Sequence, residues 1–206
     1  MNKTTERRTR ADGERSRRII LETAARLATI EGLDGLSIGR LAEHIGMSKS
    51  GLYAHFGSKE ELQLATVDTA SEIFDAEVIA PTTGVAAPLI RLEALFARYL
   101  DYLARRVFPG GCFFAAAAAE FDTHPGPVQE RINQVYADWL SMLEDLARQA
   151  QAAGEVRPDE DPVQMVFELD SYLLMANLHF VLQDSEEPLE RARSAIKNRL
   201  AMARAA

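Results

Sequence analysis

Apolar side chains recur along the chain with the spacing of α-helices, and no stretch alternates strictly between apolar and polar residues as a strand does. In a predicted helix over residues 14–30, the side chains of Ile20, Ala24, Leu27 and Ala28 fall on one face. Glycine and proline residues separate this helix from the segments that follow. The pattern therefore predicts an all-α fold.

Two short helices are predicted after the first one, over residues 38–44 and 49–55. Ser37 and Ser48 stand immediately before them, where a side-chain oxygen can accept a hydrogen bond from a free amide of the first turn. Gly46 lies between them, at a turn that needs a main-chain conformation costly for other residues. Together with the first helix they form a small three-helix head.

Longer helices make up the rest of the chain. The segment Ser58 to Glu61 has the spacing of a capping box. The predicted helices cover about residues 59–79, 89–107, 112–121, 125–153, 162–182 and 188–202. We expect about nine helices, with a head over residues 1–62 that includes a basic N-terminal arm and a helical bundle over residues 63–206.

Charge is distributed unevenly along the chain, whose formal net charge is −8. Residues 1–65 contain 11 basic and 9 acidic side chains, and the remainder contains 12 basic and 22 acidic ones. An acidic body repels the phosphates of a nucleic acid and leaves only the basic end to face them. The arginines at positions 7, 8, 10, 15, 17 and 18 form either an arm on DNA or a solvated tail.

Composition excludes several other classes of protein. No segment approaches the roughly 20 consecutive apolar residues of a membrane span, and the polar N-terminus lacks the features of a secretory signal. Cys112 is the only cysteine, and no cysteine and histidine residues have zinc-ligand spacing. We therefore expect a cytoplasmic protein with no metal, no cofactor and no membrane partner. Cys112 is either a reactive thiol or, as is more common, a small buried apolar residue.

The residues around Gly46 meet the mechanical needs of a helix-turn-helix. Leu41, Ile45, Met47 and Leu52 are spaced to pack the two short helices against each other. The second helix then presents a polar face of small residues, which allows its main chain to lie close to the floor of a DNA major groove.

The segment SKSGLYAHFGSKEEL, from Ser48 to Leu62, closely resembles the DNA-binding signature of the tetracycline-repressor (TetR) family. The similarity extends over about residues 18–64, and the rest of the chain resembles the family in length, helix content and helix order. The resemblance implies a homodimer that pairs through the last two long helices. It also implies specific binding to double-stranded DNA.

The resemblance implies DNA-binding roles for eight positions. These are Ser37, Ser48, Lys49, Ser50, Gly51, Tyr53, His55 and Lys59. Tyr53, His55 and Lys59 would contact phosphates, whereas residues 49–51 would face the bases. Each of the three phosphate ligands also has a simpler interpretation: a half-buried tyrosine, a surface histidine and an ordinary first-turn lysine. The chain departs from the family at Gly39 and Gly51, where relatives often carry larger side chains, so the operator sequence is not predictable.

The resemblance also implies an effector pocket in the bundle, with residues 109–121 as the best candidate for one wall. The candidate lining consists of Phe74, Phe96, Tyr99, Phe113, Phe114, Trp139, Met142, Met175 and His179. The alternative for each of these is an ordinary place in the core. For Asn177 and His179 the open alternatives are a bond to the effector or bonds to their own surroundings.

The functional hypothesis is a repressor that leaves a palindromic operator when a small-molecule effector binds, in the cytoplasm and associated with the nucleoid. The rival within the same fold is an effector-independent structural or cell-division factor on DNA. We do not expect an enzyme, because no set of catalytic residues and no phosphate-binding loop can be found in the sequence.

Overall fold

The computed structural model describes the main chain of residues 3–205 and the side chains of residues 13–205. Over that range it contains nine α-helices and no strand, so the predicted all-α fold is confirmed. A single isolated bridge joins Val156 to Arg204. The α-helices are α1 (Lys3–Glu31), α2 (Ile38–Ile45), α3 (Lys49–Tyr53), α4 (Lys59–Phe74), α5 (Pro88–Ala104), α6 (Phe113–Phe121), α7 (Pro127–Ala152), α8 (Pro162–Gln183) and α9 (Glu187–Ala203).

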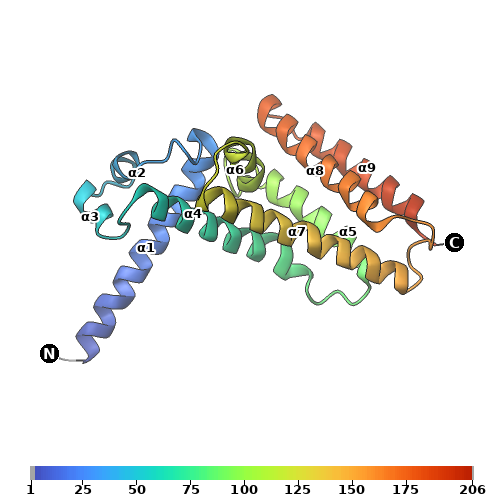
Figure 1. Cartoon of the computed structure of the whole chain (residues 1–206), viewed down its shortest axis with the longest axis horizontal. Helices are drawn as coiled ribbons and strands as arrows, with labels where there is room; N and C mark the ends of the chain where they lie inside the picture. The colour runs from blue at the N-terminus through green and yellow to red at the C-terminus, as the bar shows by residue number, and fades with distance from the viewer. Residues whose placement is uncertain (1–2, 206) are drawn as a thin grey trace.

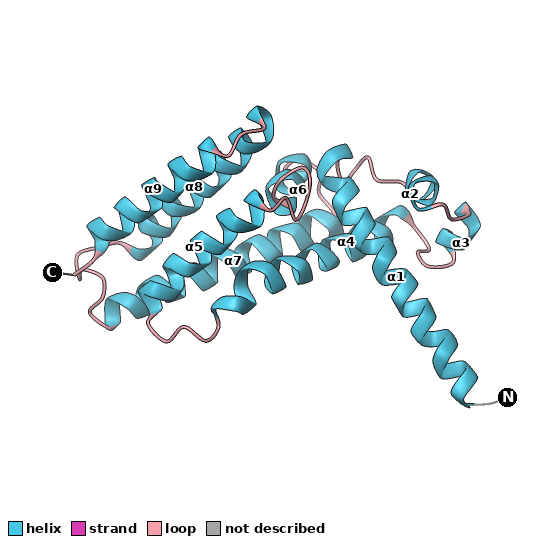
Figure 2. Ribbon diagram, turned by 180° about the vertical axis from the view of Figure 1, so that it is seen from behind, coloured by secondary structure: helices cyan, strands magenta, loops and turns pink. Residues whose placement is uncertain are grey.

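The head lies at one end of an elongated molecule, and the C-terminus lies at the other (Figure 1). Helices α4 and α7 run along the middle, and α8 pairs with α9. Figure 2 shows α5 between α7 and the α8–α9 pair, and α5 contacts all three. The predicted boundary between residues 62 and 63 falls inside α4, which contacts both α1 in the head and α7 in the body.

Helix α1 begins at Lys3, eleven residues before the predicted start. Its N-terminal half projects away from the rest of the molecule (Figures 1 and 2), whereas Ile20, Ala24 and Ala28 of its second half are buried. The additional turns consist mainly of polar residues, whose helix does not show in a pattern of apolar positions. The side chains of Arg7, Arg8 and Arg10 in the predicted arm lie outside the described residues.

Helix α4 does not continue regularly to residue 79. A π-helical turn follows over Asp75–Ile79, and a 3-10 turn follows that over Ala80–Thr82. Pro81 has no amide hydrogen and so cannot continue the α-helical bonding pattern. Single π turns are frequent at functional sites, and this one supplies part of the cavity wall described below.

Helix α8 leaves apolar side chains on its outer face. Phe167 is 67% exposed, and Val163, Met175, Leu178 and Leu182 are also exposed. By length and composition alone α8 is apolar enough to cross a membrane, and in the described chain it is the one helix of that kind. Such a helix is weak evidence for a membrane span, because long helices in soluble proteins pass the same test. In this fold the outer face indicates an interface between proteins.

Candidate nucleic-acid interface and internal cavity

The turn between α2 and α3 has the geometry that the sequence predicts. The hydroxyl of Ser37 accepts a hydrogen bond from the Arg40 amide, and the hydroxyl of Ser48 accepts one from the Gly51 amide. Gly46 ends α2 with a φ of 69°, a left-handed conformation that glycine adopts without steric cost. Leu41 and Leu52 are fully buried and hold the two helices together.

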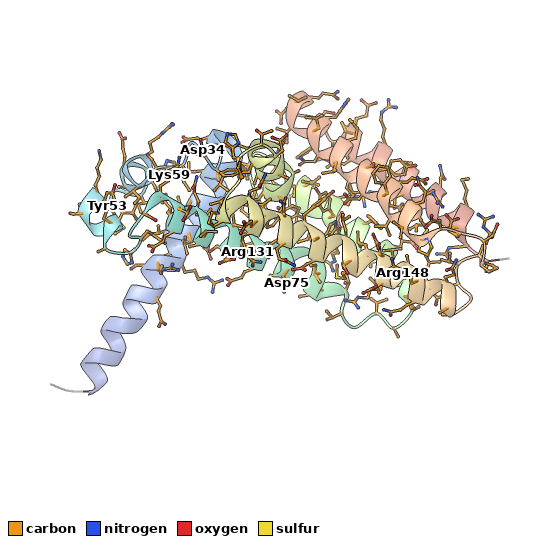
Figure 3. The ribbon with its side chains drawn as sticks, in the orientation of Figure 1. Asp34, Tyr53, Lys59, Asp75, Arg131 and Arg148 are labelled. Atoms are coloured by element: carbon orange, nitrogen blue, oxygen red, sulfur yellow. The ribbon has the colours of Figure 1, made fainter. Side chains whose placement is uncertain are left out.

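The predicted DNA-contacting residues lie on elements that meet at the head end of the molecule. Lys49 and Ser50 are exposed on α3, and Ser48, which caps this helix, is also exposed. Tyr53 is 56% exposed and points outward at the tip of the head (Figure 3), so it is not a core residue. His55 is half-buried, with its ring centroid 6.2 Å from that of Phe56. Exposed polar side chains on a short capped helix are what a groove-binding helix requires.

The lack of a side chain at Gly39 has a local structural reason, which the sequence alone does not reveal. A Cβ atom at this position would lie 3.3 Å from Lys49 Cε and 3.5 Å from Lys49 Nζ. The aliphatic part of Lys49 therefore lies across α2 at the point where α2 has no side chain. Gly39 thus sets where the Lys49 ammonium group is held on the exposed face of the head.

Lys59 does not project freely into solvent. Its ammonium nitrogen lies 2.8 Å from Oδ1 of Asp34, in the turn between α1 and α2 (Figure 3). This hydrogen bond lowers the pKa of Asp34. The pair gives no local signal in the sequence, because 25 residues separate its members.

The body contains a cavity of about 750 Å³, open to solvent on one side, between α4 with its π turn and helices α5, α6, α7 and α8. Five of the nine predicted lining residues are in its wall: Phe74, Tyr99, Phe114, Trp139 and Met142. Cys112 and Ala115 also line it, so the predicted segment 109–121 does supply a wall. The rings of Phe74 and Trp139 meet edge to face with their centroids 5.3 Å apart.

Four predicted lining residues lie elsewhere, and these predictions are corrected. Phe96 and Phe113 are buried in the core outside the lining. Met175 and His179 are exposed, whereas Asp170 and Leu174 of the same helix line the cavity. Successive helical residues are rotated by about 100°, so Met175 is directed away from the face that carries Leu174.

Asp170 is the principal site residue that the sequence analysis missed. Its side chain is in the cavity wall and the residue is only 6% exposed. One carboxylate oxygen accepts a hydrogen bond of 2.5 Å from the Tyr136 hydroxyl, and the other accepts one of 3.0 Å from Trp139 Nε1. Burial and this bond raise the pKa of Tyr136 well above its ordinary value. Asp170 and Glu168 are the two carboxylates in the otherwise mainly apolar sequence of α8, and this was the available signal.

Cys112 is a buried thiol and not an exposed reactive one. Burial raises the pKa of this thiol above its ordinary value, which lowers the fraction of the nucleophilic thiolate. Its amide donates a hydrogen bond of 2.8 Å to Oδ1 of Asn177. Of the two alternatives for Asn177, the structure therefore shows a bond to its own surroundings.

Helix α6 connects the cavity to the head. Phe114 and Ala115 line the cavity at its N-terminal end. Near its C-terminal end, the Glu120 carboxylate accepts hydrogen bonds from the amides of Leu33 and Asp34, at 2.6 and 2.9 Å. One short helix therefore contacts both the cavity and the turn that precedes the helix-turn-helix.

Two family models match the chain. The model of bacterial regulatory proteins of the tetR family covers residues 20–66, and that of the tetracyclin repressor-like C-terminal domain covers residues 88–196. The HTH-type transcriptional regulator LmrA of Bacillus subtilis is 28% identical over 142 residues, or 65% of this chain and 72% of LmrA. The transcriptional regulator AcuR of Cereibacter sphaeroides is 28% identical over 137 residues, or 65% of this chain and 62% of AcuR.

Solved structures have the same fold. A TetR transcriptional regulator from Chloroflexus aurantiacus has a TM-score of 0.88 and 26% identity, covering 95% of this chain and all of the other. AibR, solved in complex with isovaleryl coenzyme A and operator DNA, has a TM-score of 0.71 and 26% identity, covering 91% of this chain and 97% of AibR.

Proposed function

Since the chain belongs to the tetracycline-repressor family, whose members are DNA-binding transcriptional regulators, we propose that it is a repressor released from a palindromic operator by a small-molecule effector. The observation that carries this proposal is the pairing of an exposed, serine-capped helix α3 with an aromatic cavity in the body. AibR, which has the same fold, was solved with both a small molecule and operator DNA.

For DNA binding we propose that α3 enters the major groove. Lys49, Ser50 and Gly51 would face base edges, and a lysine can donate to guanine O6 and N7. Tyr53, His55 and Lys59 would contact phosphates together with the capping residues Ser37 and Ser48. Phosphate contacts position the protein, whereas the few side chains at the bases supply sequence preference.

For dimerisation we propose that the exposed apolar face of α8 packs against its own copy, together with α9. Burial of Phe167, Leu178 and Leu182 against a partner removes apolar surface from water, at about 25 cal/mol for each Å². A two-fold dimer places two α3 helices on successive major grooves, about 34–36 Å apart or a multiple of that distance. The operator would then be palindromic.

For release we propose that an effector in the cavity moves α6. Phe114 at one end of this helix would contact the effector, and Glu120 near the other end holds the turn at Leu33 and Asp34. Leu174 lines the same cavity and is partly exposed beside the α8 face. The effector must bind the two arrangements of the heads with unequal affinity, because otherwise it shifts no population.

The rival is a DNA-bound factor of the same fold without an effector. The cavity favours the regulated alternative, because a concave site lined by aromatic side chains with a few polar groups is typical of small-molecule binding. We propose no catalytic role. The proposed location is the bacterial cytoplasm, on the nucleoid.

Fluorescence anisotropy with a labelled duplex from the region upstream of the chain's own gene tests DNA binding. We expect specific binding that weakens steeply with salt, and a loss of about tenfold or more for Tyr53→Ala. Arg148→Met is the matched control, because Arg148 lies far from the head along α7 (Figure 3). Equal affinity for a scrambled duplex would contradict the proposal.

A further inference from the structure

The ionisable side chains of the cavity are strongly unbalanced in charge. Its lining contains one cation and five carboxylates, which are Asp68, Glu72, Asp75, Asp138 and Asp170. The one cation is Arg131, and its Nε lies 2.7 Å from Oδ1 of Asp68. The only basic group of the lining is therefore already neutralised, and four carboxylates remain without a counter-ion in the wall.

Asp170 is the innermost of these carboxylates. Its hydrogen-bond donors, the Tyr136 hydroxyl and the Trp139 indole, are both neutral. In the described part of the chain no lysine, arginine or histidine forms an ion pair with it. A buried charge is costly unless it is paired, so a cation that enters this cavity gains a partner that the protein itself does not supply.

The outer carboxylates form the rim. Glu72, Asp75 and Asp138 are exposed, and Figure 3 shows Asp75 and Arg131 on the edge of the molecule where α4, its π turn and α7 run together. Carboxylates of one sign around an opening raise the local concentration of cations and repel anions. The rim therefore selects by charge before the inner wall is reached.

The remaining wall is aromatic. Tyr99 and Trp139 are stacked at 6.4 Å with an interplanar angle of 28°, and Phe74 and Phe114 complete the apolar surface. The faces of such rings attract cations, and the attraction is stronger when ring and cation are both removed from water. Aromatic rings and a buried carboxylate thus favour the same kind of ligand.

We propose that the effector is a hydrophobic organic cation, an amine or quaternary ammonium compound, with its charged group at Asp170 and its apolar body against Phe74, Tyr99 and Phe114. The proposal rests on the effector-controlled function described above and adds the ligand's chemical class. It separates this chain from AibR, whose ligand isovaleryl coenzyme A carries phosphates that this ring of carboxylates would repel.

Trp139 is the only tryptophan of the chain and lies in the wall, so its fluorescence reports occupancy of the cavity. The full-length protein is titrated with two cations of different size, benzyltrimethylammonium and tetraphenylphosphonium. Each cation has a control compound of the same shape: uncharged neopentylbenzene for benzyltrimethylammonium, and anionic tetraphenylborate for tetraphenylphosphonium. Isovaleryl coenzyme A is tested as a further anion. We expect each cation to change the Trp139 emission and to bind at least tenfold more tightly than its control compound.

Substitutions of single carboxylates test which of them binds the charged group of the ligand. Asp170→Asn keeps the size of the side chain, and we expect cation affinity to fall about tenfold or more, as for truncation of a buried charge pair. Asp138→Asn at the rim has a smaller effect and remains informative if the Asp170 variant fails to fold. Asp122→Asn, an exposed carboxylate beyond α6 and outside the lining, should leave binding unchanged.

Two results would overturn the proposal: binding of tetraphenylborate or isovaleryl coenzyme A as tightly as the cations, or failure of both cations to bind. DNA anisotropy in the same samples keeps the two proposals separate. Operator release by an anion alone would refute the cation but retain effector control. Absence of specific DNA binding would refute the proposed function, whatever Trp139 reports.

Discussion

Lys59 Nζ and Asp34 Oδ1 lie 2.8 Å apart, so the lysine that the sequence assigns to a DNA phosphate is held by a carboxylate of its own head. Both side chains are exposed, and a surface pair of this kind contributes only about 0–1 kcal/mol. A phosphate can therefore replace Asp34 at little cost. Until it does, the pair links the first turn of α4 to the turn that Glu120 holds.

Removal of the Asp34 carboxylate, which competes with a DNA phosphate for Lys59, should tighten DNA binding. For Asp34→Asn we expect affinity for operator and scrambled duplexes to rise alike, by a factor of about two to five, because the released cation contacts backbone only. For Lys59→Met we expect weaker binding and a slope of log affinity against log salt that is smaller by about one. Anisotropy titrations over a series of salt concentrations measure both. An unchanged slope would show that Lys59 is not a phosphate ligand, and Arg148→Met is the control.

Gly39→Ala should affect the stability of the protein and its recognition of the operator in two separately measurable ways. Alanine favours a helix over glycine by about 0.5–1 kcal/mol, and the only close neighbours of its Cβ are atoms of the flexible Lys49 side chain. We therefore expect a higher melting temperature together with altered operator preference, because Lys49 must move. Thermal unfolding and a competition assay with mutated duplexes measure the two effects. A stabilised variant with unchanged preference would mean that Lys49 does not read bases from this position.

Loss of the Glu120 carboxylate should loosen the joint between head and body. In Glu120→Ala the amides of Leu33 and Asp34 lose their acceptor, at a cost of about 1–3 kcal/mol for a buried group. We expect hydrogen exchange at these amides to accelerate roughly tenfold or more, and effector-induced release of DNA to weaken. Asp122→Ala is the neighbouring control on an exposed carboxylate. Normal release in the Glu120 variant would remove α6 from the proposed route.

A partly buried ion network near the C-terminus gives a pH-dependent prediction. The Arg199 guanidinium bonds to Glu160 and Glu168, and this lowers the pKa of both carboxyls. Because the folded-state pKa lies below the unfolded one, this stabilisation is complete above the ordinary carboxyl pKa and is lost as pH falls through the folded value.

Arg199→Met should therefore destabilise the protein by about 1.5–3 kcal/mol near neutral pH, since Glu160, whose side chain is 8% exposed, loses its bond to Arg199 and keeps only the more exposed Arg157. Below a pH of about 4.5 the difference from the unmodified protein should shrink. Urea denaturation at two pH values measures this, and Arg148→Met, which breaks only exposed pairs, is the comparison. A difference that does not depend on pH would mean that packing, not charge, accounts for the loss.

Local signals in the sequence predicted the fold well. Serine caps, Gly46 and the prolines placed most helix ends within a few residues, because these residues act on the main chain next to them. The family resemblance placed the DNA-contacting helix for the same reason, since its motif is contiguous. The early start of α1 was missed, because a helix that projects from the molecule does not require an apolar face.

The cavity was predicted only in part, because its wall is assembled from five helices whose rotations the sequence does not specify. Phe74, Tyr99 and Trp139 were identified by residue type, yet type alone could not distinguish Leu174 from its neighbour Met175. Asp170, Arg131 and Asp68 were missed because their significance depends on partners distant in sequence. Glu120 gives no local signal, since the amides that it binds lie 86 and 87 residues away.

Exchange of heads between relatives would have to respect the contacts that cross the predicted boundary at residue 62. Gln63 donates a hydrogen bond to the Leu33 carbonyl, Glu120 accepts hydrogen bonds from the amides of Leu33 and Asp34, and Gly110 donates to the Thr29 hydroxyl. A hybrid regulator joined only at that boundary would meet foreign side chains at all three places. A graft that transfers Gln63, α6 and the loop before α6 together with the head would keep all three contacts, and this defines the smallest transferable unit of the DNA reader.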